Sequence, residues 1–147
     1  MGAFVDFAEK RFAALGIETK LSEDRKFIVL RQPADETDLL VILHEENNLL
    51  LASFYPDIRV PEPRLPAIHE FICAVNHRMR LGILDIARDN RELCFKIANL
   101  LYSDAFTEDL LRKIMATGVQ TTSMLTKGVR AILDDGASCE EALRRLS

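Results

Sequence analysis

The chain has 147 residues, of which 48% are hydrophobic and 29% charged, a balance typical of a protein that folds around a core. Its formal net charge of −4 opposes binding to the phosphate backbone of nucleic acid, and its longest apolar run, residues 39–43, is too short to span a bilayer. We therefore expect a single domain over residues 1–147, with no nucleic-acid partner and no membrane segment.

The start of the chain and the cysteines indicate a cytoplasmic protein. Residues 1–10 carry Asp6 and Glu9 among apolar residues and lack a basic start, so they do not form a secretory signal. Three cysteines are far apart and contain no CxxC pair, which is typical of reduced thiols.

The first half of the chain predicts one helix followed by strands. Apolar residues recur at helical spacing over residues 3–15, and Gly16 is a natural C-terminal cap. The polar segment 45–48 is short enough to close a hairpin. Three strands are predicted, over residues 26–31, 38–44 and 48–54.

A proline-rich segment joins these strands to a second helix. Residues 55–66 hold four of the five prolines, which predicts a stiff surface crossover. The spacing of apolar residues then predicts a helix over 65–79. A second hairpin follows, with strands at 82–88 and 92–101.

Two helices are predicted to end the chain. Thr107 opens a long helix with an apolar stripe of more than six turns, and residues 134–136 end it. Gly118 and Gly128 lie within or beside the stripe and would allow close approach to another backbone, either in the core or at an interface. Ser138 begins a capping box for a short last helix.

The predicted order is therefore α-β-β-β-α-β-β-α-α, which indicates an α+β fold: an antiparallel sheet of about five strands flanked by helices. Two residues are given architectural roles. Asn76 is at the border of the apolar sector of its helix and would tie the helix end to a neighbouring strand. Gly82 breaks the same helix and lets the backbone turn sharply.

The sharpest metal candidate is the helical series His69, Cys73 and His77, spaced four residues apart. All three cannot bind one ion, because His69 and His77 are about 12 Å apart along a helix axis. One interpretation is a metal- or thiol-responsive sensor. The other places His69 and Cys73 at the border of the core and His77 in solvent, with no metal site.

No motif indicates an enzyme. There is no GxSxG sequence, and the six glycines are too dispersed to form a phosphate-binding loop. Asp85 and Glu92 could face each other across the second hairpin, but that arrangement is typical of a solvated sheet surface. Cys94 lies in mid-strand, where a thiol is buried and inert. We expect no catalytic residues and no cofactor.

The middle strands are apolar on both faces. An antiparallel sheet with helices on one face alternates apolar and polar residues, whereas residues 39–43 and 49–52 do not. Either the chain's own helices cover both faces, or a second chain covers one of them. The second explanation predicts a partner-binding surface that includes Leu40, Ile42, Leu49 and Leu51.

The segment Phe71 to Gly82, read as F-x-x-x-V-N-H-R-M-R-L-G and followed by a hairpin and a long helix, resembles the YbjN family of bacterial proteins. The resemblance extends over nearly the whole chain. It implies a fold similar to type III secretion chaperones and a homodimer. The family is named for sensory transduction regulators, and it supplies no catalytic residues to transfer.

These observations together predict a non-enzymatic, cytoplasmic protein-interaction module, chaperone-like or regulatory, which binds a protein partner through apolar sheet and helix surfaces.

Overall fold

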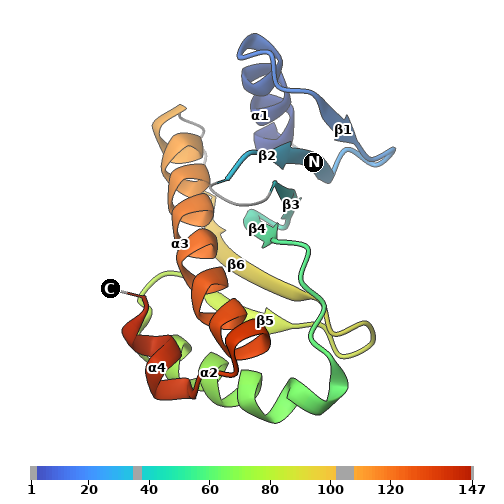
Figure 1. Cartoon of the computed structure of the whole chain (residues 1–147). Coiled ribbons are helices and arrows are strands. Elements are labelled where there is room, and N and C mark those ends of the chain that lie inside the picture. The colour runs from blue at the N-terminus through green and yellow to red at the C-terminus, as the bar shows by residue number, and fades with distance from the viewer. Residues whose placement is uncertain (1–2, 35–37, 102–107, 147) are drawn as a thin grey trace.

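In the computed structural model, which describes residues 3–34, 38–101 and 108–146, one antiparallel sheet forms the centre of the molecule (Figure 1). The strand order in the sheet is β1-β2-β3-β4-β6-β5. The strands are β1 (Thr19–Leu21), β2 (Phe27–Gln32), β3 (Leu39–Glu46), β4 (Leu49–Tyr55), β5 (Ile83–Ile86) and β6 (Leu93–Leu100). The helices are α1 (Ala3–Ala14), the short 3-10 helix η1 (Glu62–Arg64), α2 (Leu65–Arg78), α3 (Glu108–Asp135) and α4 (Cys139–Arg144).

The α+β prediction is confirmed, with one difference in the strand count. The described residues form six strands where about five were predicted, because β1 was missed. β1 has only three residues, too few to show an alternating pattern. The predicted helix start at Thr107 lies outside the described residues, and α3 is described from Glu108.

The β3–β4 hairpin closes through a two-residue turn. Glu46 pairs with Leu49, and the two residues between them, Asn47 and Asn48, have φ of 53° and 62°. Asparagine tolerates this left-handed conformation better than most residues, and two such residues in succession form the turn that matches the twist of a hairpin. The turn fixes the register of the two longest apolar runs.

The proline-rich crossover is more closely packed than predicted. Ile58 and Val60 are buried, so the segment is not a simple surface connection. The Leu93 amide donates to the Ile58 carbonyl at 2.8 Å, and the Val60 amide donates to the Arg91 carbonyl at 2.9 Å. The crossover therefore runs along the β5–β6 hairpin, and its apolar residues complete the core.

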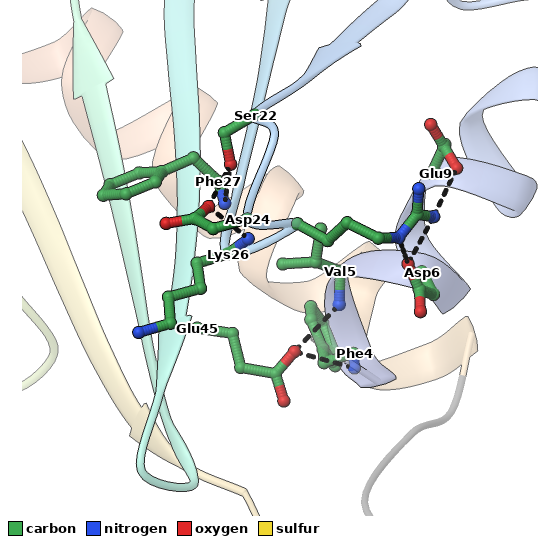
Figure 2. A network of polar contacts seen from close by, with 10 residues as sticks. Phe4, Val5, Asp6, Glu9, Ser22, Asp24, Lys26, Phe27 and Glu45 are labelled. Atoms are coloured by element: carbon green, nitrogen blue, oxygen red, sulfur yellow. Dashed lines mark hydrogen bonds and ion pairs between the residues drawn. The ribbon is translucent and has the colours of Figure 1, made fainter. Parts of the chain in front are cut away.

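α1 and α3 cover the same face of the sheet. Glu45 on β3 points to the side of α1, where its Oε1 accepts from the Phe4 amide at 2.8 Å and the Val5 amide at 3.0 Å (Figure 2). Alternation along β3 puts Val41 on that side too, and Val41 pairs with Phe54, whose ring lies against α3. The core accordingly lies between the helices and one face of the sheet.

The two glycines of α3 make room for aromatic rings of the chain's own core. The nearest atoms to a side chain added at Gly118 belong to the ring of Phe54 on β4. At Gly128 they belong to the ring of Phe71 on α2. Both glycines of α3 therefore face an aromatic ring, whereas the sequence suggested that they allow another backbone to approach the helix. α3 therefore lies directly on β4 and packs against α2.

The end of α2 is tied to the edge strand β5. The Asn76 amide nitrogen donates to the Leu84 carbonyl at 2.9 Å, and its Oδ1 accepts from the Leu84 amide at 2.8 Å. Gly82, with φ of 79°, makes the corner between them, and a Cβ there would stand 2.5 Å from the Lys96 carbonyl oxygen. These two residues set the position of α2 at that edge.

Candidate functional site

The four residues predicted to bind a partner lie on the face of the sheet opposite the helices. Leu40 and Ile42 alternate along β3 with fully buried residues and are themselves half-buried. On β4, Leu51 is half-buried and Leu49 is 41% exposed. In the described part of the chain, no helix covers this face, because α1 and α3 both pack on the other one, and α2 and α4 pack against α3.

Neighbouring strands extend this apolar surface. Ile42 pairs with Val29 on β2, Leu51 pairs with Ala98 on β6, and Leu49 pairs with Leu100, which is 61% exposed. We call this surface the open face. Its apolar members are Phe27, Val29, Leu40, Ile42, Leu49, Leu51, Ile83, Ala98 and Leu100.

Several charged and polar groups on the open face are paired with one another, while the exposed Lys20 and Arg31 lie on the same face, opposite Val29 and Leu40. The His44 ring stacks on Phe27, with centroids 4.1 Å apart and planes at 8°. Lys26 Nζ lies 3.0 Å from Glu46 Oε1, and this hydrogen bond lowers the pKa of Glu46 and raises that of Lys26. The apolar residues of the open face are therefore bordered by charged residues on β1 and β2 and at the β3–β4 turn.

At the crossover end of this side of the sheet, the reactive groups are shielded. Burial raises the pKa of Tyr55 to about 12. The same cause raises the pKa of the Cys94 thiol, which is 3% exposed. Both groups are held in their neutral, unreactive forms, as expected of an inert thiol in a strand.

The carboxylate pair considered from the sequence does not form. Asp85 pairs in register with Cys94, and its Oδ2 lies 3.2 Å from Lys96 Nζ. Glu92 lies just before the first residue of β6, where its carbonyl accepts a hydrogen bond from the Ala87 amide and its backbone forms a β-bridge with Arg59. The prediction that the two side chains could face each other is wrong, because the hairpin register offsets them.

Comparison with known families gives a match over most of the chain. A family model with the description "Putative bacterial sensory transduction regulator", named YbjN, matches residues 9–131. The chain belongs to the YbjN family.

A solved structure agrees with this assignment at the level of the fold. The crystal structure of YbjN, "a putative transcription regulator from E. coli", aligns with a TM-score of 0.61 at 15% sequence identity. The alignment covers 82% of this chain and 86% of that chain. A comparison with curated proteins finds no match.

The helical series considered as a metal site in this YbjN-family chain faces solvent. His69, Cys73 and His77 are all exposed on α2, so the expectation that His69 and Cys73 border the core is wrong. α2 buries the face that carries Ile68 and Phe71. Within residues 3–34, 38–101 and 108–146, no three His, Cys, Asp or Glu side chains are grouped so that they could hold a metal ion.

Sequence reasoning missed part of the open face of this YbjN-family chain. Phe27 and Leu100 lie at the ends of their strands, where alternation is hard to assign, yet they are 37% and 61% exposed. The register of β2 and β6 against the middle strands is what adds them to the surface. None of the helices within the described ranges is both long and apolar enough to cross a bilayer.

Proposed function

We propose that this YbjN-family protein is a regulatory, non-enzymatic protein-interaction module that binds its partner through the open face. The observation that carries the proposal is a group of exposed and half-buried apolar residues, bordered by charged ones, on a sheet whose other face already holds the core. Apolar surface of this extent is costly in water and generally marks a binding site. Asp85 and Glu92 are not opposite each other and the Cys94 thiol is buried, which supports a role in binding.

The first partner that we propose is a second copy of the chain. A two-fold dimer uses the same patch on both subunits, so a flat apolar sheet face is self-complementary in chemistry. Two such faces pack about 10 Å apart, with their side chains interdigitating. The half-buried Ile42 and Leu51 would become the centre of this interface, with the Lys26–Glu46 pair outside it.

We also propose that the protein is cytoplasmic. Cys73 is exposed and free, and Cys94 and Cys139 are also unpaired. An exposed free thiol is compatible with a reducing compartment.

Sedimentation velocity on the wild type and on Ile42→Lys tests the proposal. We expect the mass of two chains for the wild type and of one chain for Ile42→Lys, because a lysine at the centre would be buried without a partner. Leu81→Lys is the matched control: Leu81 is 65% exposed and lies outside the sheet, so this variant should remain a dimer. Circular dichroism should show that both variants are folded, and Leu81→Lys should melt within a few degrees of the wild type, whereas Ile42→Lys should melt lower because it loses the dimer.

If the wild type is a monomer, the partner that binds the open face is a different protein. Affinity capture from the native cell, with the wild type and both variants as baits, tests for such a partner. A chaperone-like or regulatory partner should be retained by wild-type and Leu81→Lys baits and lost from the Ile42→Lys bait. A monomeric wild type whose captured proteins are the same for all three baits would contradict the proposal.

A further inference from the structure

A cleft of about 480 Å³ lies on the helix side of the sheet, between α1 and the first half of α3. α1 packs on β1, β2 and β3, whereas α3 packs on β4 and β6, so the two helices stand next to each other above different strands (Figure 1). An ion pair between Arg11 of α1 and Glu108 of α3 bridges the space. This cleft is on the opposite side of the sheet from the open face.

The interior of the cleft is apolar. Phe12, Leu111 and Met115 form buried walls, and Ile17 and Val119 line it from either side. Leu15 at its mouth is 60% exposed. A ligand with an apolar body would remove from water the exposed Leu15 and the half-buried Ile17 and Val119, which favours binding in proportion to the area covered.

The mouth of the cleft carries more positive than negative charge. Its lining has two guanidinium groups, Arg11 and Arg112, against one carboxylate, Glu108. Arg11 Nη2 binds Glu108, but its buried Nε has no hydrogen-bond partner among the described residues. Arg112 is 69% exposed, with Nη2 as far as 4.0 Å from Asp109 Oδ1. An anionic head group would complement these two arginines.

The size of the cleft indicates a small molecule. Pockets of about 300–1,000 Å³ with apolar walls and a few polar groups are typical of small-ligand sites. A protein partner needs about 800 Å² of surface on each side, which suits a flat face better than a cleft.

We propose that this cleft binds an amphiphile with a carboxylate head and a hydrocarbon tail, such as a medium-chain fatty acid. The tail lies between Phe12, Leu111 and Met115, and the carboxylate accepts hydrogen bonds from Arg112 and from Arg11, in competition with Glu108. The proposal does not depend on the open face.

Calorimetric titration with octanoate, octylamine and octanol tests the head-group preference. We expect octanoate to bind about tenfold more tightly than octanol, because a hydrogen-bonded charge pair adds to the same apolar contact, and octylamine to bind most weakly. Octanoate should shift the methyl resonance of Met115 and leave those of Met79 and Met124 unchanged, since Met115 is the one of these three that lines the cleft. Lengthening the tail should tighten binding by up to about fourfold per methylene until the cleft is full.

Two sets of variants locate the site. Ala116→Trp places a large ring in the cleft from an exposed position and should weaken octanoate binding at least about tenfold. Ala13→Trp adds the same ring at an exposed position of α1 outside the lining and should bind as the wild type does. The double variant Arg11→Gln with Arg112→Gln should bind octanoate and octanol equally, with octanol unchanged.

Equal binding of the three head groups, no binding of any of them, or undiminished octanoate binding by Ala116→Trp would overturn the proposal. Loss of octanoate binding in Ile42→Lys would also overturn it, because the ligand would then lie on the open face. A Met115 signal that responds only to an amphipathic helical peptide would assign the cleft to a protein segment instead.

Discussion

The carboxylate of Glu45 acts as a cap for a helix that begins some forty residues earlier in the chain. The first amide groups of a helix have no partner within it, and Glu45 accepts from two of them, at Phe4 and Val5. The side chain is 6% exposed, so water does not replace it easily. One residue of β3 thus fixes where α1 starts and how it is seated on the sheet.

We expect Glu45→Ala to destabilise the fold by about 1–3 kcal/mol, since two amides lose a charged acceptor. Hydrogen exchange at Phe4 and Val5 should become faster. Glu46→Ala is the matched control: it removes the exposed neighbour that pairs with Lys26, and it should change stability little. Equal melting and exchange for both variants would show that Glu45 is not the cap.

Tyr55 gives a prediction for alkaline pH. Its pKa is raised from 10.0 to about 12, first by burial and then by the neighbouring Cys94. The folded state therefore keeps a proton that the unfolded state loses, and stability falls as pH rises from about 10 to about 12. Tyrosinate absorbance should show a transition near pH 12 that Tyr55→Phe removes, and this variant should lose less stability over the same range. A single tyrosinate transition near pH 10 in the wild type would contradict it.

At the scale of elements, the position of α3 depends on the absence of a side chain at Gly118. Alanine usually favours a helix over glycine by about 1 kcal/mol. Here its Cβ would meet the ring of Phe54 in a close-packed core, and overpacking of this kind costs about 1–3 kcal/mol.

We therefore expect Gly118→Ala to lower the free energy of unfolding, as measured by urea denaturation. Adding Phe54→Leu should recover part of the loss relative to Phe54→Leu alone, because the smaller side chain makes room. Thr117→Ala, at the adjacent position of α3, should be nearly neutral. A Gly118→Ala variant more stable than the wild type would show that the ring can move away at little cost.

Most helices and strands could be predicted from the sequence, but the way they pack together could not. Helical spacing located α1, α2 and α3, and the two asparagines after Glu46 indicated a turn. The run Leu39–Leu43 could not show which of its faces meets the helices, because both faces are apolar. Burial decides that point: Val41 and Leu43 are fully buried, whereas Leu40 and Ile42 are not.

Contacts between segments far apart in the chain could not be predicted, because the residues around each contact form no pattern that indicates its partner. Glu45 belongs to a polar group of residues that reads as a turn, and nothing near it in the sequence points to α1. The cleft between α1 and α3 likewise exists only because two helices far apart in the chain stand on different strands. Asn76 is the exception, since its place at the border of an apolar sector already suggested a hydrogen-bonded tie.

At the scale of the whole molecule, the two edges of the sheet differ. An unpaired strand edge can pair with another chain, and proteins commonly block it. At β5 the Asn76 side chain occupies both the amide and the carbonyl of Leu84. The opposite edge, β1, is only three residues long.

We expect Asn76→Leu to expose the β5 edge and to promote association between sheets. Light scattering and thioflavin fluorescence on heating should rise earlier than in the wild type. Asn76→Asp should be intermediate, because a carboxylate still accepts from the Leu84 amide but cannot donate to its carbonyl. Unchanged aggregation in Asn76→Leu would show that another part of the molecule protects this edge.

The alternation of β3 has a consequence for how the protein can change over time. Residues 39, 41 and 43 pack in the core, and residues 40 and 42 belong to the open face. Residues for folding and residues for binding therefore alternate along one strand. A substitution at residue 40 or 42 changes the open face and leaves the core residues unchanged. Binding preference can therefore change during evolution while the fold is kept. The insertion or deletion of one residue turns the core residues of the rest of the strand to the open face and the open-face residues to the core. Both folding and binding are then impaired.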